Sequence, residues 1–135
     1  MNELALFYKN QINECLLNLN LSTDDNVYII GSVPEVSNFK ALYECQHAAK
    51  SDSSCTYETI NKSKRILYRK EFNTELKKLL EKSSSRAIFV DPFDALCDKK
   101  AGRCFGIQNG NMLYSDQNHL SLSGALTFID KLNAP

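Results

Sequence analysis

The sequence predicts an α/β protein built around a parallel sheet. Two short runs, Val27–Ile30 and Ala87–Val90, are almost continuously apolar, which is typical of strands buried on both faces of a parallel sheet. Longer segments around these runs repeat apolar residues at helical spacing. Because helices and strands alternate along the chain, we expect helices to connect the strands and pack on the sheet.

Residues 3–20 are predicted to form an amphipathic helix. Its apolar positions recur at helical spacing, and they are Leu4, Phe7, Tyr8, Ile12, Cys15, Leu16 and Leu19. The turn cluster Ser22–Asn26 separates this helix from the first strand. After that strand, Gly31–Pro34 is expected to form a loop at the end of the sheet where α/β proteins usually build their sites.

The middle of the chain is predicted to be mainly helical. Residues 37–48 fit a short helix, and the polar stretch Lys50–Thr56 fits a loop. A long helical pattern runs from Tyr57 to Lys82. Its apolar side consists of Ile60, Leu67, Phe72, Leu76, Leu79 and Leu80. Ser83–Ser85 ends this pattern before the second strand.

The C-terminal part is predicted to contain a hairpin and a last helix. Asn109 and Gly110 lie between two apolar triplets, which is a strong signal for a two-residue hairpin turn. The last helix is expected to begin at Ser121 or Ser123, since either hydroxyl is able to cap it. At the end of the second strand, Asp91 is a site candidate by position, but Asp91–Pro92 also makes a good turn, which we favour.

Composition and charge exclude several functions. The 135 residues suffice for one domain, and 16 basic residues balance 16 acidic ones, so no net field recruits nucleic acid or an anionic membrane. Basic residues cluster between Lys62 and Lys82, but interleaved glutamates indicate a solvated helix face. No apolar run approaches the roughly 20 residues of a membrane span. The N-terminus also lacks the features of a signal peptide.

Two parallel strands alone make a poor sheet. We therefore expect residues 1–135 to form a single, partial domain, the second half of a larger α/β unit. An apolar face or edge at Val27–Ile30 and Ala87–Val90 should then lie uncovered and favour self-association.

The five cysteines suggest an oxidising compartment. Cys45 and Cys55 flank one short polar segment, and Cys97 and Cys104 flank another, so two local disulfides are expected, with Cys15 left over. Five reduced thiols remain the alternative. A zinc site is disfavoured, because no C-x-x-C pair is present and the two histidines lie far apart in the sequence. No metal or other cofactor is predicted.

Asp116 and His119 are the main candidate site residues. A carboxylate held against an imidazole fixes the ring tautomer and stabilises the imidazolium that forms during acyl transfer. In such a site His119 is the general base for a serine hydroxyl, and Asp116 orients it. The alternative is a helix-capping Asp beside a surface His, because a D-x-x-H pattern often arises by chance.

Several blocks together carry a family resemblance. These blocks are Val27–Ile30 with Pro34, Cys45 and Cys55; Phe89–Pro92 with Leu96, Cys97 and Cys104; and Leu113–Asp116 with His119–Ser121 and Gly124–Ala125. Over nearly its whole length, the chain resembles the C-terminal half of an SGNH (GDSL-like) domain. It is most similar to the extracytoplasmic SGNH domain fused to multi-spanning membrane acyltransferases. The resemblance implies a flavodoxin-like, three-layer fold, truncated here to its C-terminal βαβα portion.

The resemblance also implies a function. Asp116 and His119 would be the acid and base members of a Ser-His-Asp triad in a periplasmic enzyme. That enzyme would pass an acetyl group from an acyl donor to a cell-surface polysaccharide, the lipopolysaccharide O-antigen in preference to peptidoglycan. An upstream membrane acyltransferase domain is the implied partner. The family's Gly-Asp-Ser nucleophile block and its Gly-x-Asn-Asp block are both missing from this sequence, so the chain alone is expected to be nearly inactive.

Four further residues are weaker candidates for the site. Ser32 follows a strand, as a nucleophile does, but Pro34 argues against the helix that a nucleophile elbow requires. Tyr114 either lines a sugar site or packs as a hairpin aromatic, and packing is favoured. Ser121 and Ser123 are better explained as helix caps. Two rival functions remain: an SGNH esterase that hydrolyses carbohydrate or lipid esters with the same residues, and a non-catalytic truncated remnant or binding module.

Overall fold

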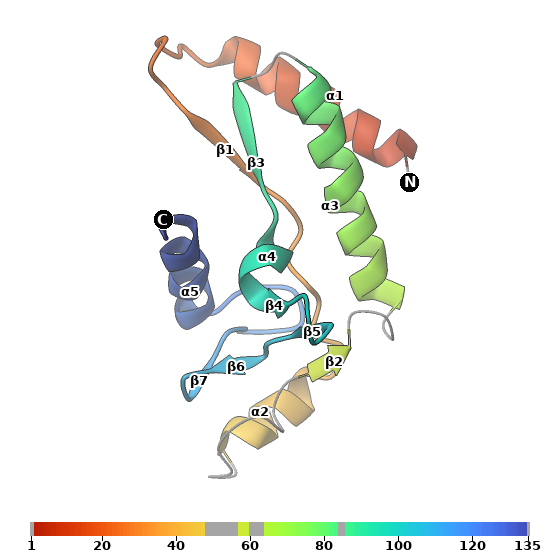
Figure 1. The fold of residues 1–135 in the computed structure, drawn as a ribbon, viewed down its shortest axis with the longest axis vertical. Coiled ribbons are helices and arrows are strands. Elements are labelled where there is room, and N and C mark those ends of the chain that lie inside the picture. The colour runs from red at the N-terminus through yellow and green to blue at the C-terminus, as the bar shows by residue number, and fades with distance from the viewer. Residues whose placement is uncertain (1, 48–56, 60–63, 84–85, 135) are drawn as a thin grey trace.

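The computed structural model describes residues 2–47, 57–59, 64–83 and 86–134 (Figure 1). The elements are, in chain order, α1 (Asn2–Asn18), β1 (Val27–Ile30), α2 (Phe39–His47), β2 (Tyr57–Thr59), α3 (Lys64–Lys82), β3 (Ala87–Val90), α4 (Pro92–Leu96), β4 (Cys97–Asp98), β5 (Arg103–Cys104), β6 (Ile107–Gln108), β7 (Asn111–Met112) and α5 (Leu122–Leu132).

The two apolar runs form a parallel pair, as predicted. Strands β1 and β3 align in register from Val27 opposite Ala87 to Ile30 opposite Val90. Helices α1 and α3 pack against one another beside this pair (Figure 1). Their contact includes an edge-to-face pair of rings, in which the centroids of Tyr8 and Phe72 lie 5.6 Å apart. The α/β class and the parallel pairing are therefore confirmed.

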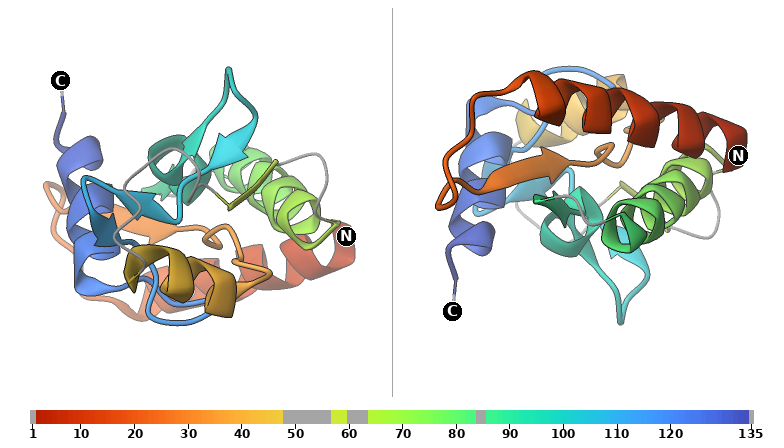
Figure 2. Two further views of the ribbon diagram at one scale, coloured as in Figure 1. Left: turned by 90° about the horizontal axis from the view of Figure 1, so that it is seen from below. Right: turned by 90° about the horizontal axis from the view of Figure 1, so that it is seen from above.

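The other strands form small antiparallel sheets at the opposite end of the molecule. Strand β5 pairs with both β2 and β4, and β6 pairs with β7. The β6–β7 turn has positive φ angles at Asn109 (51°) and Gly110 (76°), as a two-residue hairpin turn of the primed type requires. The predicted hairpin is thus confirmed. Helix α2 lies alongside β7, where Gln46 Nε2 donates to the Gly110 carbonyl at 2.7 Å (Figure 2).

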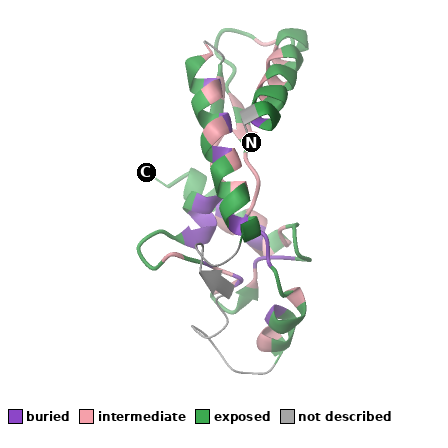
Figure 3. Cartoon of the chain, turned by 90° about the vertical axis from the view of Figure 1, so that its right-hand side faces the viewer, coloured by how far each residue is buried: buried purple, intermediate pink, exposed green. Residues whose placement is uncertain are grey.

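The buried core lies mainly around α4, α5 and the segment after β7. Its members are Val36, Leu42, Ala95, Leu96, Leu113, Tyr114 and Phe128. A second cluster consists of Ile66, Phe93, Cys97 and Cys104. Helix α1 and the upper part of α3 carry mostly exposed or half-buried side chains (Figure 3). The apolar core is therefore concentrated in the last third of the chain, which follows β3.

One face of the parallel pair is uncovered. The side chains of Tyr28 and Ile30 are each 57% exposed, and Ile88, the register partner of Tyr28, is 43% exposed. These residues alternate with half-buried Ile29 and Phe89, whose side chains belong to the opposite face of the strands. The expected uncovered apolar face is confirmed at these three positions.

Two predictions of secondary structure are wrong. Residues 57–59, assigned to the long helix, form strand β2, and the helix α3 begins only at Lys64. An aromatic residue and Thr59 suit a strand, and pairing with β5 decides the outcome. Helix α4 was not predicted, because a single helical turn leaves no readable periodicity. The loop predicted at Lys50–Thr56 lies outside the described residues.

Candidate active site

Asp116 and His119 lie on a short loop between β7 and α5. The loop is closed at its base by a bridge between Tyr114 and Leu120 and by the Ser115 N–H, which donates to the His119 carbonyl at 2.9 Å. Beyond it, Ser121 caps α5 by accepting the Gly124 N–H at 3.1 Å. Strand pairing on one side and a helix cap on the other therefore fix the two ends of the loop.

The loop places the carboxylate directly against the imidazole. Asp116 Oδ2 lies 2.8 Å from His119 Nδ1, and Asp116 Oδ1 accepts the backbone N–H groups of Asn118 at 2.7 Å and His119 at 2.8 Å. An ionised carboxylate only accepts hydrogen bonds, so this contact requires a proton on Nδ1. The other ring nitrogen, Nε2, is then left to exchange protons with a reacting group.

These contacts lower the pKa of Asp116 below its ordinary value. The largest cause is the hydrogen bond from the Asn118 backbone N–H, followed by those from the side chain and the backbone of His119. The carboxyl group therefore stays ionised, as a group that orients an imidazole must. Both side chains are open to solvent, His119 at 75% and Asp116 at 54% exposure.

The loop lies beside the segment that follows β1. The Val36 N–H donates to the Gln117 carbonyl at 2.9 Å, and Arg69 of α3 donates to Asn118 Oδ1 at 3.3 Å. The carboxyl end of the parallel pair is thus adjacent to the Asp116–His119 loop. This is the edge of an α/β sheet at which ligands usually bind.

Neither a metal site nor a membrane span is found in the described part of the chain. No group of three or more His, Cys, Asp or Glu side chains there is arranged to hold an ion. None of the described helices is both long and apolar enough to cross a bilayer.

A comparison with known families identifies the domain. A family model described as "SGNH domain (fused to AT3 domains)" matches residues 4–133. The chain belongs to the SGNH domain family. Membership indicates esterase-like or acyltransferase-like chemistry, and the description names a fusion to acyltransferase domains. No curated protein and no solved structure shows significant similarity to this SGNH domain.

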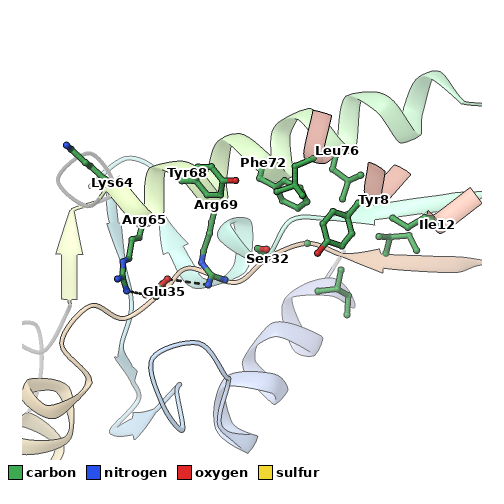
Figure 4. Close-up of a pocket in the computed structure, with 14 residues that line it drawn as sticks. Tyr8, Ile12, Ser32, Glu35, Lys64, Arg65, Tyr68, Arg69, Phe72 and Leu76 are labelled. Carbon is green, nitrogen blue, oxygen red and sulfur yellow. Dashed lines mark hydrogen bonds and ion pairs between the residues drawn. The ribbon is translucent and has the colours of Figure 1, made fainter. Parts of the chain in front are cut away.

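Two weaker site candidates of the SGNH domain lie in different surroundings. Tyr114 is 1% exposed and packs in the core, which agrees with the favoured interpretation of a packed hairpin aromatic. Ser32 lines a cavity of about 650 Å³ between α1, α3 and the end of β1 (Figure 4). Among the hydrogen bonds of the described residues, none joins Ser32 to His119.

Asp91 has a structural role. Its carboxylate caps α4 by accepting the Phe93 N–H at 3.1 Å, and Pro92 occupies the first turn of that helix. Asn73 Nδ2 donates to the same carboxylate at 2.8 Å. Asp91 therefore begins a helix where the sequence suggested a turn.

The cysteines are paired in part. Cys97 and Cys104 form a disulfide that links β4 to β5, at positions that are also register partners. Cys15 is a free, exposed thiol. Cys55 lies outside the described residues, so the predicted bridge from Cys45 to Cys55 stays a prediction.

Sequence reasoning missed three polar residues around the site: Glu35, Arg69 and Asn73. Glu35 and Asn73 are buried, at 7% and 0% exposure. Asn73 was detectable, because it falls on the buried stripe of α3 with Ile66, Leu76 and Leu80, and a polar residue there needs partners. Glu35 and Arg69 had no comparable local signal, since their contact joins segments distant in the chain.

Proposed function

We propose that this SGNH domain supplies the acid and base members of a Ser-His-Asp site that O-acetylates a cell-surface polysaccharide. The observation that carries the proposal is the 2.8 Å contact between His119 Nδ1 and Asp116 Oδ2, on a loop beside the carboxyl end of the parallel pair. Family membership supports it, since the family is described as fused to AT3 domains. A periplasmic location and an O-antigen or peptidoglycan acceptor belong to the same proposal.

In the proposed reaction, His119 Nε2 moves protons while Asp116 holds Nδ1. Nε2 takes the proton of a serine hydroxyl as the serine Oγ attacks the acetyl carbonyl of the donor, and the proton passes to the leaving group. A hydroxyl of the polysaccharide then attacks the acetyl-serine, and Nε2 takes its proton. The released serine oxygen recovers a proton from the imidazolium, so the site returns to its starting state.

We propose that the serine comes from a segment outside these 135 residues, on a strand that pairs with β1. The sequence has no Gly-Asp-Ser block. Among the described strands β1 pairs only with β3, so its other edge is open to a further strand. A strand parallel to β1 would end at the same edge of the sheet as Ser32, close to the Asp116–His119 loop.

The test uses the membrane acyltransferase that carries the domain. His119→Ala is expected to reduce polysaccharide acetylation to background, and Asp116→Asn to lower its rate by up to about 10⁴-fold, at unchanged protein abundance. His47→Ala is the matched control, because His47 is an exposed histidine on α2 whose described contacts are with Tyr43 of the same helix. Full acetylation by the His119→Ala protein would refute the proposal.

An esterase is the second candidate, and the exposure of His119 favours it. Transfer to a sugar hydroxyl requires that water be kept from the acetyl-enzyme, whereas the His119 side chain is 75% exposed. Measuring acetate release and acetylated polysaccharide in one reaction separates the two. Acetate as the main product, at a rate independent of polysaccharide, identifies an esterase. Loss of neither activity in the His119→Ala protein would favour a non-catalytic domain.

A further inference from the structure

Glu35 is a buried carboxylate held between two guanidinium groups of α3. Its Oε1 accepts from Arg65 Nη1 at 2.6 Å, and its Oε2 lies 3.2 Å from Arg69 Nη2 (Figure 4). The Glu35 side chain is only 9% exposed, and a buried charge is tolerated when ion pairs and hydrogen bonds compensate it. This cluster therefore fixes the segment after β1 against α3.

The two arginines differ in what else they contact. Arg69 Nη2 also donates to Asn118 Oδ1 at 3.3 Å, and its side chain is 28% exposed. The Arg65 side chain is 71% exposed, and its described polar contact is with Glu35. Arg69 alone of the pair therefore joins the buried carboxylate to the loop that carries His119.

Asn118 connects Arg69 to the Asp116 carboxylate. Its backbone N–H donates to Asp116 Oδ1 at 2.7 Å, while its side chain accepts from Arg69. The neighbouring Gln117 carbonyl accepts the Val36 N–H at 2.9 Å, so the segment after β1 contacts the loop directly as well. Movement of Asn118 would carry its N–H away from the carboxylate that orients His119.

We propose that Arg69 is a positioning residue for the Asp116–His119 pair, acting through Asn118. Glu35 fixes the guanidinium, the guanidinium fixes the side chain of Asn118, and the backbone of Asn118 fixes the Asp116 carboxylate against Nδ1. Arg65 compensates the charge of Glu35 without contacting the loop. The catalytic meaning of this role rests on the proposed function, but the positioning itself does not.

The experiment measures the tautomer of His119 in the 135-residue chain. Two-bond proton–nitrogen spectra of histidine-labelled protein, above the pH at which the imidazole is protonated, give the ratio of the Nδ1–H to the Nε2–H form. Asp116 favours the Nδ1–H form. Arg69→Gln is expected to lower this ratio by about threefold, the size of a weak side-chain coupling. Arg65→Gln removes the same charge and is expected to leave the ratio unchanged.

A second variant guards against an effect on folding. Asn118→Ala keeps both arginines and is expected to lower the ratio as much as Arg69→Gln, with no further decrease in the double variant. Arg69→Lys should restore part of the ratio. An unchanged ratio in both Arg69→Gln and Asn118→Ala would overturn the proposal, as would an equal decrease in Arg65→Gln.

The outcome is independent of acetylation. The tautomer ratio needs neither the serine nor a substrate. If Arg69→Gln and Asn118→Ala lower the ratio but the His119→Ala protein still acetylates, only the proposed function is refuted. If the ratio is unchanged in both variants but His119→Ala abolishes acetylation, only the positioning role is refuted.

Discussion

The side-chain amide of Asn73 forms two hydrogen bonds with the backbone of Ser32, both 2.8 Å long. Its Oδ1 accepts the Ser32 N–H, and its Nδ2 donates to the Ser32 carbonyl. Because Nδ2 also donates to Asp91 Oδ1, one buried amide joins the carboxyl ends of β1 and β3. Asn73 of α3 thus forms, with the backbone just after β1, the two hydrogen bonds that a neighbouring strand would form there.

Asn73→Ala is expected to lower the free energy of unfolding by about 1–3 kcal/mol, because it removes the hydrogen-bond partner of the half-buried Ser32 backbone and leaves Asp91 Oδ1 with the Phe93 N–H. Urea denaturation measures the change. Thr74→Ala is the matched control, since Thr74 is exposed and bonds only within its own helix, to the Lys70 carbonyl. Thr74→Ala should change the stability little or raise it slightly, because alanine is the better helix former. An equal change in both variants would mean that the hydrogen bonds of Asn73 to the strand ends do not determine the effect.

Gly124→Ala is expected to lower the free energy of unfolding by about 1–3 kcal/mol. An added Cβ at Gly124 would collide with the Leu113 carbonyl, which is backbone and already accepts the Ser121 N–H at 2.9 Å. Thermal unfolding of the variant should show a lower midpoint. Ser123→Ala, one residue earlier in α5, should leave the midpoint unchanged or raise it slightly, because alanine is the better helix former. An unchanged midpoint in Gly124→Ala would show that α5 shifts without cost.

Loss of the Cys97–Cys104 disulfide is expected to cost about 2.5 kcal/mol, the chain-entropy value for so short a loop. Cys97→Ala/Cys104→Ala and the native chain are compared by urea denaturation, with Cys15→Ser as the control for removing a free thiol. After alkylation of the unreduced chain, the intact mass should show that only one of the five cysteines has been alkylated. Alkylation of Cys97 or Cys104 would contradict the bridge.

The contribution of Asp116 to stability is expected to vanish in acid. The folded-state pKa of Asp116 is lowered by its hydrogen bonds, so the stabilisation is present above the ordinary carboxyl pKa of about 3.9. It is lost as the pH falls through the lower, folded-state value. Asp116→Asn should therefore be less stable than the native chain near pH 6, and the two should converge as the pH falls through the lowered folded-state pKa. Asp130→Asn, an exposed change of equal charge, is the control, and a constant difference down to low pH would contradict the prediction.

Local patterns predicted the elements of this fold better than its polar contacts. Val27–Ile30 and Ala87–Val90 are unmistakable as strands, and Asn109–Gly110 specifies its turn, because each signal lies within a few residues. Strand β2 was misjudged because its pairing with β5 depends on a segment more than forty residues away. Asp116 and His119 were found because they are three residues apart. Arg69 was missed because its partners, Glu35 and Asn118, lie far from it in the sequence.

The uneven burial along the chain has a consequence for motion. Ala5 is the only buried residue among the described residues of α1, and β1 and β3 contain none, whereas Leu113 and Tyr114 are almost completely buried. The Gly31 N–H bonds to the Val90 carbonyl at 2.9 Å and the Leu113 N–H to the Gly106 carbonyl at the same distance, so bond length does not distinguish them.

Amide hydrogen exchange should distinguish them, with Gly31 exchanging by local opening at a lower free energy than Leu113. Equal protection would show that the molecule opens as one unit. If Gly31 exchanges faster, the parallel strands open locally while the base of the Asp116–His119 loop stays folded. The reason is that the bridge between Tyr114 and Leu120 lies in the slowly exchanging part. The Asp116–His119 pair then remains assembled while the parallel strands open.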